Sequence, residues 1–132
     1  MSQENVRAVR HLAEAINLGG PPPADLVAPT VEIVNATTAV TDGTYLGHEG
    51  AEQWRRDMFD VVDDARYVLD QVLASGTDYV VITNRIVGRG SSSGVPVDLR
   101  WTSVFWFRDG KVSRIAGYNR RREALQAVGL SE

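Results

Sequence analysis

One charged side chain lies where a ligand-binding cation would be useful. Arg85 stands in the run Val80–Val87, whose other members are mostly apolar. Burying a guanidinium without a partner is costly, so a pocket position for Arg85 requires an acidic group or a ligand nearby. Two interpretations stay open. Arg85 lies on an exposed or dimer-facing side of its strand, or it is a pocket cation that binds a carboxylate or a ketone oxygen.

Uncharged polar side chains offer further candidates for a binding site. Asn35 follows a short apolar run and serves either a pocket or the backbone groups at a strand end. Ser103 alternates with Trp101 and Phe105, so these three residues share one face of a predicted strand. Asn119 ends the next strand, on a face that also carries small and apolar residues. Plain core packing explains the aromatic members equally well.

The composition excludes several classes of function. The chain has 132 residues, 43% of them hydrophobic, a net charge of −3 and a pI of about 5.4. It therefore lacks the basic face that nucleic acids require. Cysteine is absent and only two histidines occur, which disfavours a metal site, and no uncharged run exceeds 10 residues, whereas a membrane span needs about 20. We expect a cytoplasmic protein with no metal or organic cofactor, which binds neither nucleic acid nor membrane.

The hydrophobic period changes near residue 65, from helical spacing to strand alternation. Gly19–Pro23 must end the first helix, because proline cannot continue it. Asp42-Gly43 and Asp109-Gly110 are turn signals, because Asp-Gly supplies the positive φ that tight turns need. The predicted elements are a helix over 3–18, a short strand over 31–34, a helix that carries Trp54, strands over 66–74, 79–88 and 96–107, a last strand ending near Asn119 and a closing helix over 121–128.

These elements favour one packing arrangement. Two helices with one apolar face each, and four long strands in a twisted meander, pack most economically when the sheet curls around the helices. That arrangement leaves a cavity between the helices and the sheet. We therefore predict a single α+β domain over residues 1–132, with two helices in the concave face of a strongly curved, mostly antiparallel sheet.

Four segments carry a resemblance to known proteins: Tyr45–Gly50, the helix with Trp54, the hairpin Phe107–Val112 and the chain end Glu123–Leu130. Together with the element order, they resemble the SnoaL-like proteins of the NTF2-like superfamily over nearly the whole chain. The resemblance implies a cone-shaped fold around one pocket for a small, largely apolar molecule. It also implies the lining of that pocket, with Asn35, Arg85, Ser103 and Asn119 as polar groups and Trp54, Trp101 and Phe105 as the apolar wall.

The superfamily includes ketosteroid isomerases, but their catalytic residues do not carry over. Those enzymes use a carboxylate base and an oxyanion site made by a tyrosine and a protonated aspartic acid. The corresponding positions fall at Asn35, Leu12 and about Ser103. An amide cannot take up the proton and leucine cannot donate a hydrogen bond. We expect isomerase chemistry of this type to be absent.

The limonene-epoxide hydrolases of the superfamily match slightly better. Asn35 and Arg85 correspond to the asparagine that holds water and to the arginine of an Asp-Arg-Asp relay. Ile33 stands at the tyrosine position, and Val87 and Gly117 stand at the two aspartate positions. Without either carboxylate there is no general base. The resemblance thus implies a pocket with one cation and no carboxylate base, suited to a ligand with a carboxylate, phenolate or ketone oxygen.

Three functions remain open. The chain binds a small apolar or acidic organic molecule, or is an active isomerase, cyclase or epoxide hydrolase for a polycyclic or terpenoid substrate, or is an interaction module using the sheet face. An enzyme needs an ionisable pair in the cavity, whereas an interaction module would fill the cone with large side chains. Trp106 and Tyr118 give the outer sheet face an apolar character, from which we predict a homodimer through the sheet.

Overall fold

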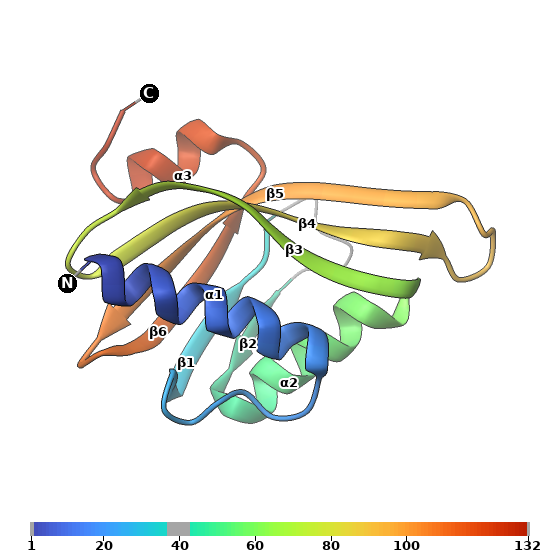
Figure 1. Ribbon diagram of the computed structural model, residues 1–132, viewed down its shortest axis with the longest axis horizontal. Helices are drawn as coiled ribbons and strands as arrows, with labels where there is room; N and C mark the ends of the chain where they lie inside the picture. The colour runs from blue at the N-terminus through green and yellow to red at the C-terminus, as the bar shows by residue number, and fades with distance from the viewer. Residues whose placement is uncertain (1, 37–42, 132) are drawn as a thin grey trace.

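The computed structural model describes residues 2–36 and 43–131. Their elements follow the predicted order of helix, strand, helix and strand meander, closed by a short helix, with one further short strand, Thr44–Leu46, that was not predicted (Figure 1). The elements are α1 (Ser2–Leu18), β1 (Val27–Val34), β2 (Thr44–Leu46), α2 (Gly47–Asp60), β3 (Val62–Ser75), β4 (Tyr79–Gly90), β5 (Pro96–Arg108), β6 (Lys111–Tyr118) and α3 (Arg121–Ala127).

The strands form one six-stranded sheet in the order β2-β1-β6-β5-β4-β3. All neighbours pair antiparallel except β1 and β6, which are parallel. The sheet curves strongly around α1 and α2, and the long β4–β5 hairpin projects from one side of the molecule (Figure 1). The predicted α+β fold with a curved, mostly antiparallel sheet is therefore confirmed.

Two strands begin earlier than the sequence predicts. β1 starts at Val27, and its pairing with β6 is irregular between Val27 and Glu32. β3 starts at Val62 and includes Asp64, a non-glycine residue with φ of 53°. Prolines and consecutive aspartates are rare in strands, and they hid these strand starts in the sequence.

The two Asp-Gly turn signals differ in outcome. Asp109 and Gly110 have φ of 53° and 79° between β5 and β6, and positive φ at both central residues is the conformation of a type I′ hairpin turn. The hairpin prediction is confirmed. The other signal includes Asp42, which lies outside the described residues.

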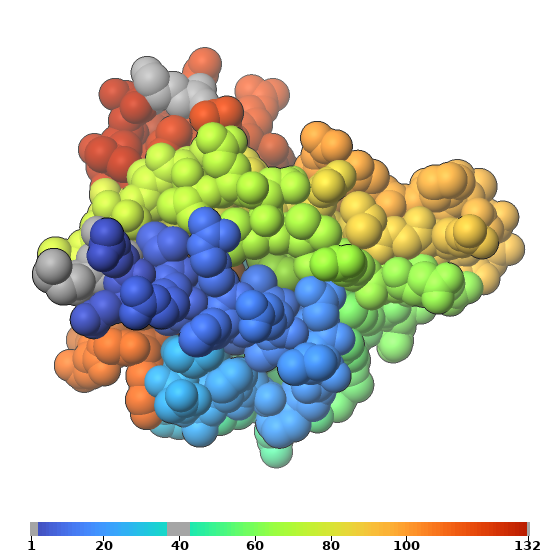
Figure 2. All heavy atoms as spheres, viewed as in Figure 1, coloured from blue at the N-terminus to red at the C-terminus, as the bar shows by residue number. Residues whose placement is uncertain are grey.

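α1 is fixed to the sheet by its apolar face and by one amide. Val9, Leu12 and Ile16 recur at helical spacing and are buried in the core. Asn17, one residue before the helix end, bonds to the edge strand β3. Its Nδ2 donates to the Tyr67 carbonyl oxygen at 2.8 Å, and its Oδ1 accepts from the Tyr67 backbone N–H at 2.8 Å. The side chain of Asn17 thus bonds to β3 as a neighbouring strand would, and it fixes the end of α1 to this strand. In Figure 2 the dark blue residues of α1 lie against the green residues of β3.

α2 begins at Gly47, whose φ of 71° favours glycine. The His48 ring donates from Nε2 to the Val27 carbonyl oxygen at 2.9 Å, so this histidine ties the helix start to β1. Ala51 and Trp54 are buried against the core. These contacts place α2 beside α1 on the concave side of the sheet.

A closed polar cluster lies inside the cone, between β3, β4 and β5. The Tyr67 hydroxyl and the Ser103 hydroxyl both donate to Oδ1 of Asn84, the latter over 3.0 Å. Asn84 Nδ2 donates to the Trp101 carbonyl oxygen at 2.8 Å. Among the described residues, no buried side-chain nitrogen or oxygen lacks a partner. The polar atoms of the cone interior are therefore satisfied by one another.

The outer, convex face is partly covered by α3, and this corrects one expectation. Ala124 and Leu125 are buried against Val81 and Val104 of β4 and β5, and Trp106 packs at the edge of this second core. Tyr118 belongs to the same cluster and, like Trp106, is half-buried. The closing helix was predicted, but its packing was not. Its apolar side is buried against the outer face of the sheet, which was expected to remain exposed.

The amide of Asn17 yields a stability prediction. Asn17→Ala removes two hydrogen bonds between α1 and β3, and we expect it to lower the free energy of unfolding by about 1–2 kcal/mol. Urea denaturation followed by circular dichroism measures this change. Glu14→Ala, at an exposed position of the same helix, is the control and should change the free energy by less than about 0.5 kcal/mol. Equal stability of the Asn17→Ala variant and the wild type would contradict the assignment.

Candidate functional site

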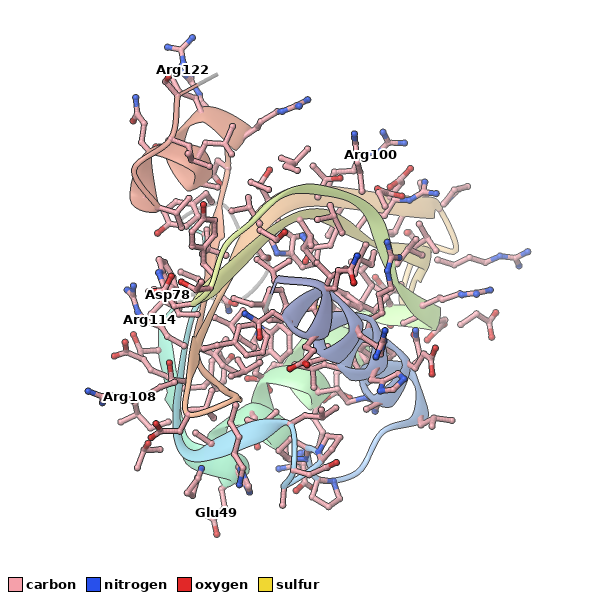
Figure 3. All side chains as sticks on the ribbon, turned by 60° about the vertical axis from the view of Figure 1, so that its left-hand side comes forward. Glu49, Asp78, Arg100, Arg108, Arg114 and Arg122 are labelled. Atoms are coloured by element: carbon pink, nitrogen blue, oxygen red, sulfur yellow. The ribbon has the colours of Figure 1, made fainter. Side chains whose placement is uncertain are left out.

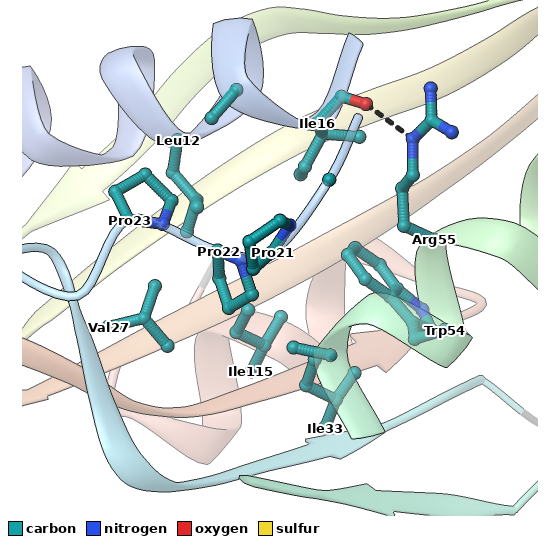
Figure 4. A pocket seen from close by; sticks show the side chains of 13 residues that line it. Leu12, Ile16, Pro21, Pro22, Pro23, Val27, Ile33, Trp54, Arg55 and Ile115 are labelled. Atoms are coloured by element: carbon teal, nitrogen blue, oxygen red, sulfur yellow. Dashed lines mark hydrogen bonds between the residues drawn. The ribbon is translucent and has the colours of Figure 1, made fainter. Parts of the chain in front are cut away.

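A small apolar cavity lies in the concave side, between α1, α2 and the strands β1 and β6. Its volume is about 30 Å³. Figure 4 shows Pro21 and Pro22 in the middle of its lining, with Leu12, Trp54 and Ile115 around them. The lining residues are Leu12, Ala15, Ile16, Gly20, Pro21, Pro22, Pro23, Val27, Ile33, Ala51, Trp54, Arg55 and Ile115.

The cavity is closed by the segment between α1 and β1. A volume of about 30 Å³ accommodates little more than one water molecule, whereas sites for small organic ligands span about 300–1,000 Å³. Pro21 and Pro22 have no backbone N–H with which to bond to the rest of the domain. The segment is anchored at its ends, where Gly19 N–H donates to Ala15 and where Leu26 N–H donates to Pro23. Between these anchors it is held mainly by side-chain packing.

One cation stands at the rim of this cavity, and sequence reasoning missed it. Arg55 Nε donates to the Ile16 carbonyl oxygen at 2.8 Å, and Nη2 donates to the Asn17 carbonyl oxygen at 3.4 Å. The guanidinium carbon lies 4.1 Å from the ring centre of Phe59, a cation–π contact. Arg55 thus joins α2 to the last carbonyls of α1. Its only sequence signal is its place next to Trp54, which the helical pattern already placed on the buried side.

Four of the predicted site residues lie on the concave side of the sheet and do not border the groove on its convex face. Trp54 lines the cavity, and its Nε1 donates to Oδ1 of Asn35 at 2.9 Å. Phe105 is buried in the main core, and Ser103 belongs to the polar cluster around Asn84. Of these four, only Trp54 borders the cavity itself. Asn35 holds the indole of Trp54 in place, and the other two lie deeper in the cone.

The remaining predicted residues border a groove on the convex face, a placement that differs from the prediction of a shared internal pocket. Arg85, Trp101 and Asn119 line this groove, of about 550 Å³, together with residues of β3 and α3. The Trp101 ring itself lies on the concave side, like the side chains of Ser103 and Phe105, and its centre lies 6.1 Å from that of Tyr67. The seven residues that were expected to form one site thus do not border one common cavity.

Arg85 does not supply a cation to the concave cavity. Its Nε lies 3.1 Å from Oδ1 of Asp70 and its Nη1 lies 3.2 Å from Oδ2 of Asp98, and its side chain is 31% exposed. The reason is strand alternation, because Asn84 points into the cone and its neighbour must therefore point away from it. Of the two interpretations left open by the sequence, the structure shows the exposed one. Asp98 also pairs with Arg100 at 3.1 Å, as expected for a surface pair.

Comparison with known proteins identifies the family. Residues 9–115 match the family model of the SnoaL-like domain. The chain belongs to the SnoaL-like domain family. This confirms the resemblance seen in the sequence. No curated protein matches the chain significantly.

Solved structures share the fold of this SnoaL-like domain at low sequence identity. Bal32a, from a soil-derived mobile gene cassette, is 19% identical with a TM-score of 0.73, covering 93% of this chain and 94% of its own. An NTF2-like protein of unknown function from Burkholderia pseudomallei is 19% identical with a TM-score of 0.71, covering 98% and 99%. TerC, co-crystallised with polyporic acid, is 21% identical with a TM-score of 0.67, covering 89% and 92%. These similarities establish the NTF2-like fold.

The described part of the SnoaL-like domain contains no buried carboxylate or histidine that could act as a base in the cone. Gly117, at one aspartate position of the epoxide hydrolases, shows a physical reason. A Cβ atom there would lie 3.0 Å from the Ala36 backbone nitrogen and 3.3 Å from Cδ1 of Trp101, so a longer side chain would need both neighbours to shift. The described residues also include no group of three potential metal ligands and no helix that could cross a membrane.

Tyr67 is the one buried ionisable side chain in the described part of the domain. Desolvation by burial raises the pKa of its hydroxyl far above the ordinary value. Tyr67 is therefore neutral at physiological pH and donates a hydrogen bond to Asn84. It cannot act as a proton acceptor there.

The raised pKa of Tyr67 predicts how stability changes in alkali. The unfolded protein ionises this tyrosine above about pH 10 and the folded protein does not, so the unfolded state binds fewer protons and stability falls as pH rises. Tyr67→Phe should lose less stability than the wild type between about pH 10 and pH 12, although it is less stable at pH 7. Urea denaturation at a series of pH values measures both slopes. Identical slopes would show that Tyr67 is not held neutral by burial.

Proposed function

We propose that this SnoaL-like domain binds a small, largely apolar molecule at the cavity between α1 and α2. The observation that carries the proposal is the character of the lining. Leu12, Ile16, Val27, Ile33 and Ile115 form a continuous apolar wall beneath Pro21–Pro23. The polar groups of the cone interior are satisfied by one another, so binding there draws on apolar burial.

The bound state requires the Gly19–Pro23 segment to move outward. The cavity of about 30 Å³ is about tenfold too small for an organic ligand, and the rest of its wall belongs to helices and strands. The segment is the one part of the lining outside regular structure and depends mainly on packing. Such weakly bonded segments open at low free-energy cost. Its displacement would extend the cavity without disturbing the sheet.

Arg55 gives the proposed site a preference for an acidic head group. Among the described residues, its guanidinium is bonded through Nε and Nη2 to the end of α1, so the donors of Nη1 remain for a ligand. A carboxylate at the rim would form a charge-assisted hydrogen bond with this nitrogen. TerC, which shares the fold, was crystallised with polyporic acid, and an acidic ligand here agrees with that finding.

One observation favours the alternative of an interaction module. Large side chains, including Trp54, Tyr67, Trp101 and Phe105, fill most of the cone. A cone filled with large side chains is the arrangement expected of an interaction module rather than of a ligand-binding protein. The alternative of an active isomerase, cyclase or epoxide hydrolase has less support, because the described residues place no carboxylate inside the cone.

The binding proposal is tested with two probes of equal size, benzoate and benzyl alcohol, by isothermal titration calorimetry. We expect the wild type to bind both, with benzoate the tighter. Arg55→Gln keeps a donor for the end of α1. It should weaken the binding of benzoate by about fivefold, or about 1 kcal/mol, and leave the affinity for benzyl alcohol nearly unchanged. Arg85→Gln, on the convex face, is the matched control and should change neither affinity.

Three outcomes would contradict this proposal. If the wild type binds neither probe saturably, the cone does not open and the interaction module gains support. If Arg55→Gln weakens the binding of both probes equally, the guanidinium supports the structure of the site and does not contact the carboxylate of benzoate. If Arg85→Gln alone weakens benzoate, the acid binds on the other face of the sheet.

The homodimer and the cytoplasmic location stay predictions. α3 packs against the part of the convex face that carries Trp106 and Tyr118, so the apolar surface that motivated the dimer is smaller than expected. The neighbouring part carries charged side chains instead. Light scattering at tens of micromolar protein would support the dimer with twice the chain mass, and a mass of 14.5 kDa would contradict it.

A further inference from the structure

Arg55 differs from the arginines that stand out from the surface of the domain. Figure 3 shows Arg100, Arg108 and Arg122 pointing outward. Arg55 is half-buried instead, and its guanidinium is in contact with the end of α1, with Gly19 and with the ring of Phe59. These contacts decide which part of the guanidinium a ligand can reach.

The end of α1 holds one edge of the guanidinium. The last carbonyl groups of a helix have no partner within the helix, and they lie at the negative end of its dipole, where a cation is favoured. The carbonyl oxygens of Ile16 and Asn17 are two such groups, and they accept from Nε and Nη2 of Arg55 at 2.8 Å and 3.4 Å. This edge is therefore fixed by groups that need a donor.

Gly19 covers one face of the same guanidinium. A Cβ atom on Gly19 would lie 3.2 Å from the guanidinium carbon and 3.3 Å from both Nη1 and Nη2, so Gly19 lies over the flat side of the group. The ring centre of Phe59 lies 4.1 Å from the guanidinium carbon, and because Gly19 takes one face, the ring takes the other. A ligand can therefore reach Arg55 only in the plane of the guanidinium, at its outer edge.

The outer edge keeps three of the five N–H groups of Arg55. Nη1 carries two of them and Nη2 carries one, counting the bonds to the described residues. One N–H of each nitrogen points outward in parallel, which is the arrangement that a carboxylate accepts with both of its oxygens. A single hydroxyl oxygen does not match this pair of donors.

From these contacts we infer that Gly19 determines the specificity of the proposed site for a carboxylate bound through both oxygens. Because position 19 has no side chain, the guanidinium can lie flat against the backbone with its outer edge free. A side chain there would displace the group that selects the acid. This role of Gly19 rests on the proposed function, since it concerns the acid preference of the same site.

The neighbouring glycine provides a matched control. Gly19 and Gly20 both have φ of 83°, so a side chain meets the same backbone cost at either position. A Cβ atom on Gly20 would have no atom of the described residues within 4 Å, its chain neighbours aside. Asparagine tolerates positive φ better than most residues, so Gly19→Asn and Gly20→Asn differ mainly in their effect on Arg55.

The test combines NMR of the free protein with calorimetry. The Nε–H signal of Arg55, assigned by its loss in Arg55→Gln, should shift and exchange faster with water in Gly19→Asn and stay unchanged in Gly20→Asn. Gly19→Asn should also lower the preference for benzoate over benzyl alcohol by about fivefold, as Arg55→Gln does. Gly20 borders the cavity, so Gly20→Asn can change both affinities together, but it should leave their ratio unchanged.

Two further variants complete the test. Gly19→Ala, with a shorter side chain, should give smaller changes of both kinds, and it serves if Gly19→Asn does not fold. Arg55→Lys keeps the charge but not the parallel N–H groups, so it should lose most of the preference for benzoate.

The role of Gly19 is overturned if Gly19→Asn leaves the Arg55 signal unchanged, or if the two asparagine variants lower the preference equally. Binding through both oxygens is wrong if Arg55→Lys prefers benzoate as strongly as the wild type does. A wild type that prefers benzoate, with the same preference in Gly19→Asn, would contradict the role of Gly19 alone. A wild type that binds neither probe would contradict the proposed function and this role with it.

Discussion

The side-chain oxygen of Asn84 accepts hydrogen bonds from two buried hydroxyls, those of Tyr67 and Ser103, and thereby joins the three long strands inside the cone. Leaving any of these groups unpaired in the core would cost about 1–3 kcal/mol. Asn84 is therefore held facing inward. Because side chains alternate along a strand, the inward position of Asn84 also turns Arg85 outward. The same alternation decides which residues of β4 face the cone and which face the convex side.

This constraint explains why the sequence predicted the fold well and the site poorly. Hydrophobic period and the Asp109-Gly110 turn are local signals, and they located the helices and the long strands. The face of Arg85 is not a local property, because β4 is apolar on both sides. Val80 and Ile82 are buried in the main core, while Val81 between them is buried under α3. With apolar residues on both faces, alternation could not show which side of β4 faces the cone.

The features of the candidate site that the sequence did not predict arise from contacts between distant segments. Arg55 bonds to carbonyls of Ile16 and Asn17, which lie in another helix. Pro21 and Pro22 were correctly read as the end of α1, but their place over the cavity depends on how β1 returns under the helices. Asn35, in contrast, was predicted to lie at the pocket, and in the structure its Oδ1 accepts a hydrogen bond from the indole of Trp54, which lines the cavity. The sequence can thus indicate that a residue lies near the pocket, but it does not show which side chain that residue will contact.

The closed polar cluster also bears on what chemistry the cone can support. A catalytic base needs a carboxylate or a histidine within reach of a ligand, and the described interior offers Tyr67, which burial keeps protonated. Gly117 is packed against the Ala36 backbone and Trp101, so an acid at this position would require both the backbone after β1 and the Trp101 side chain to shift. The hydroxyls of Tyr67 and Ser103, which could otherwise donate to a ligand oxygen, are already bound to Asn84. An interior that satisfies its own polar groups offers no free hydrogen-bonding side chain to a polar substrate among the described buried residues, so apolar contacts are what the cone interior can supply.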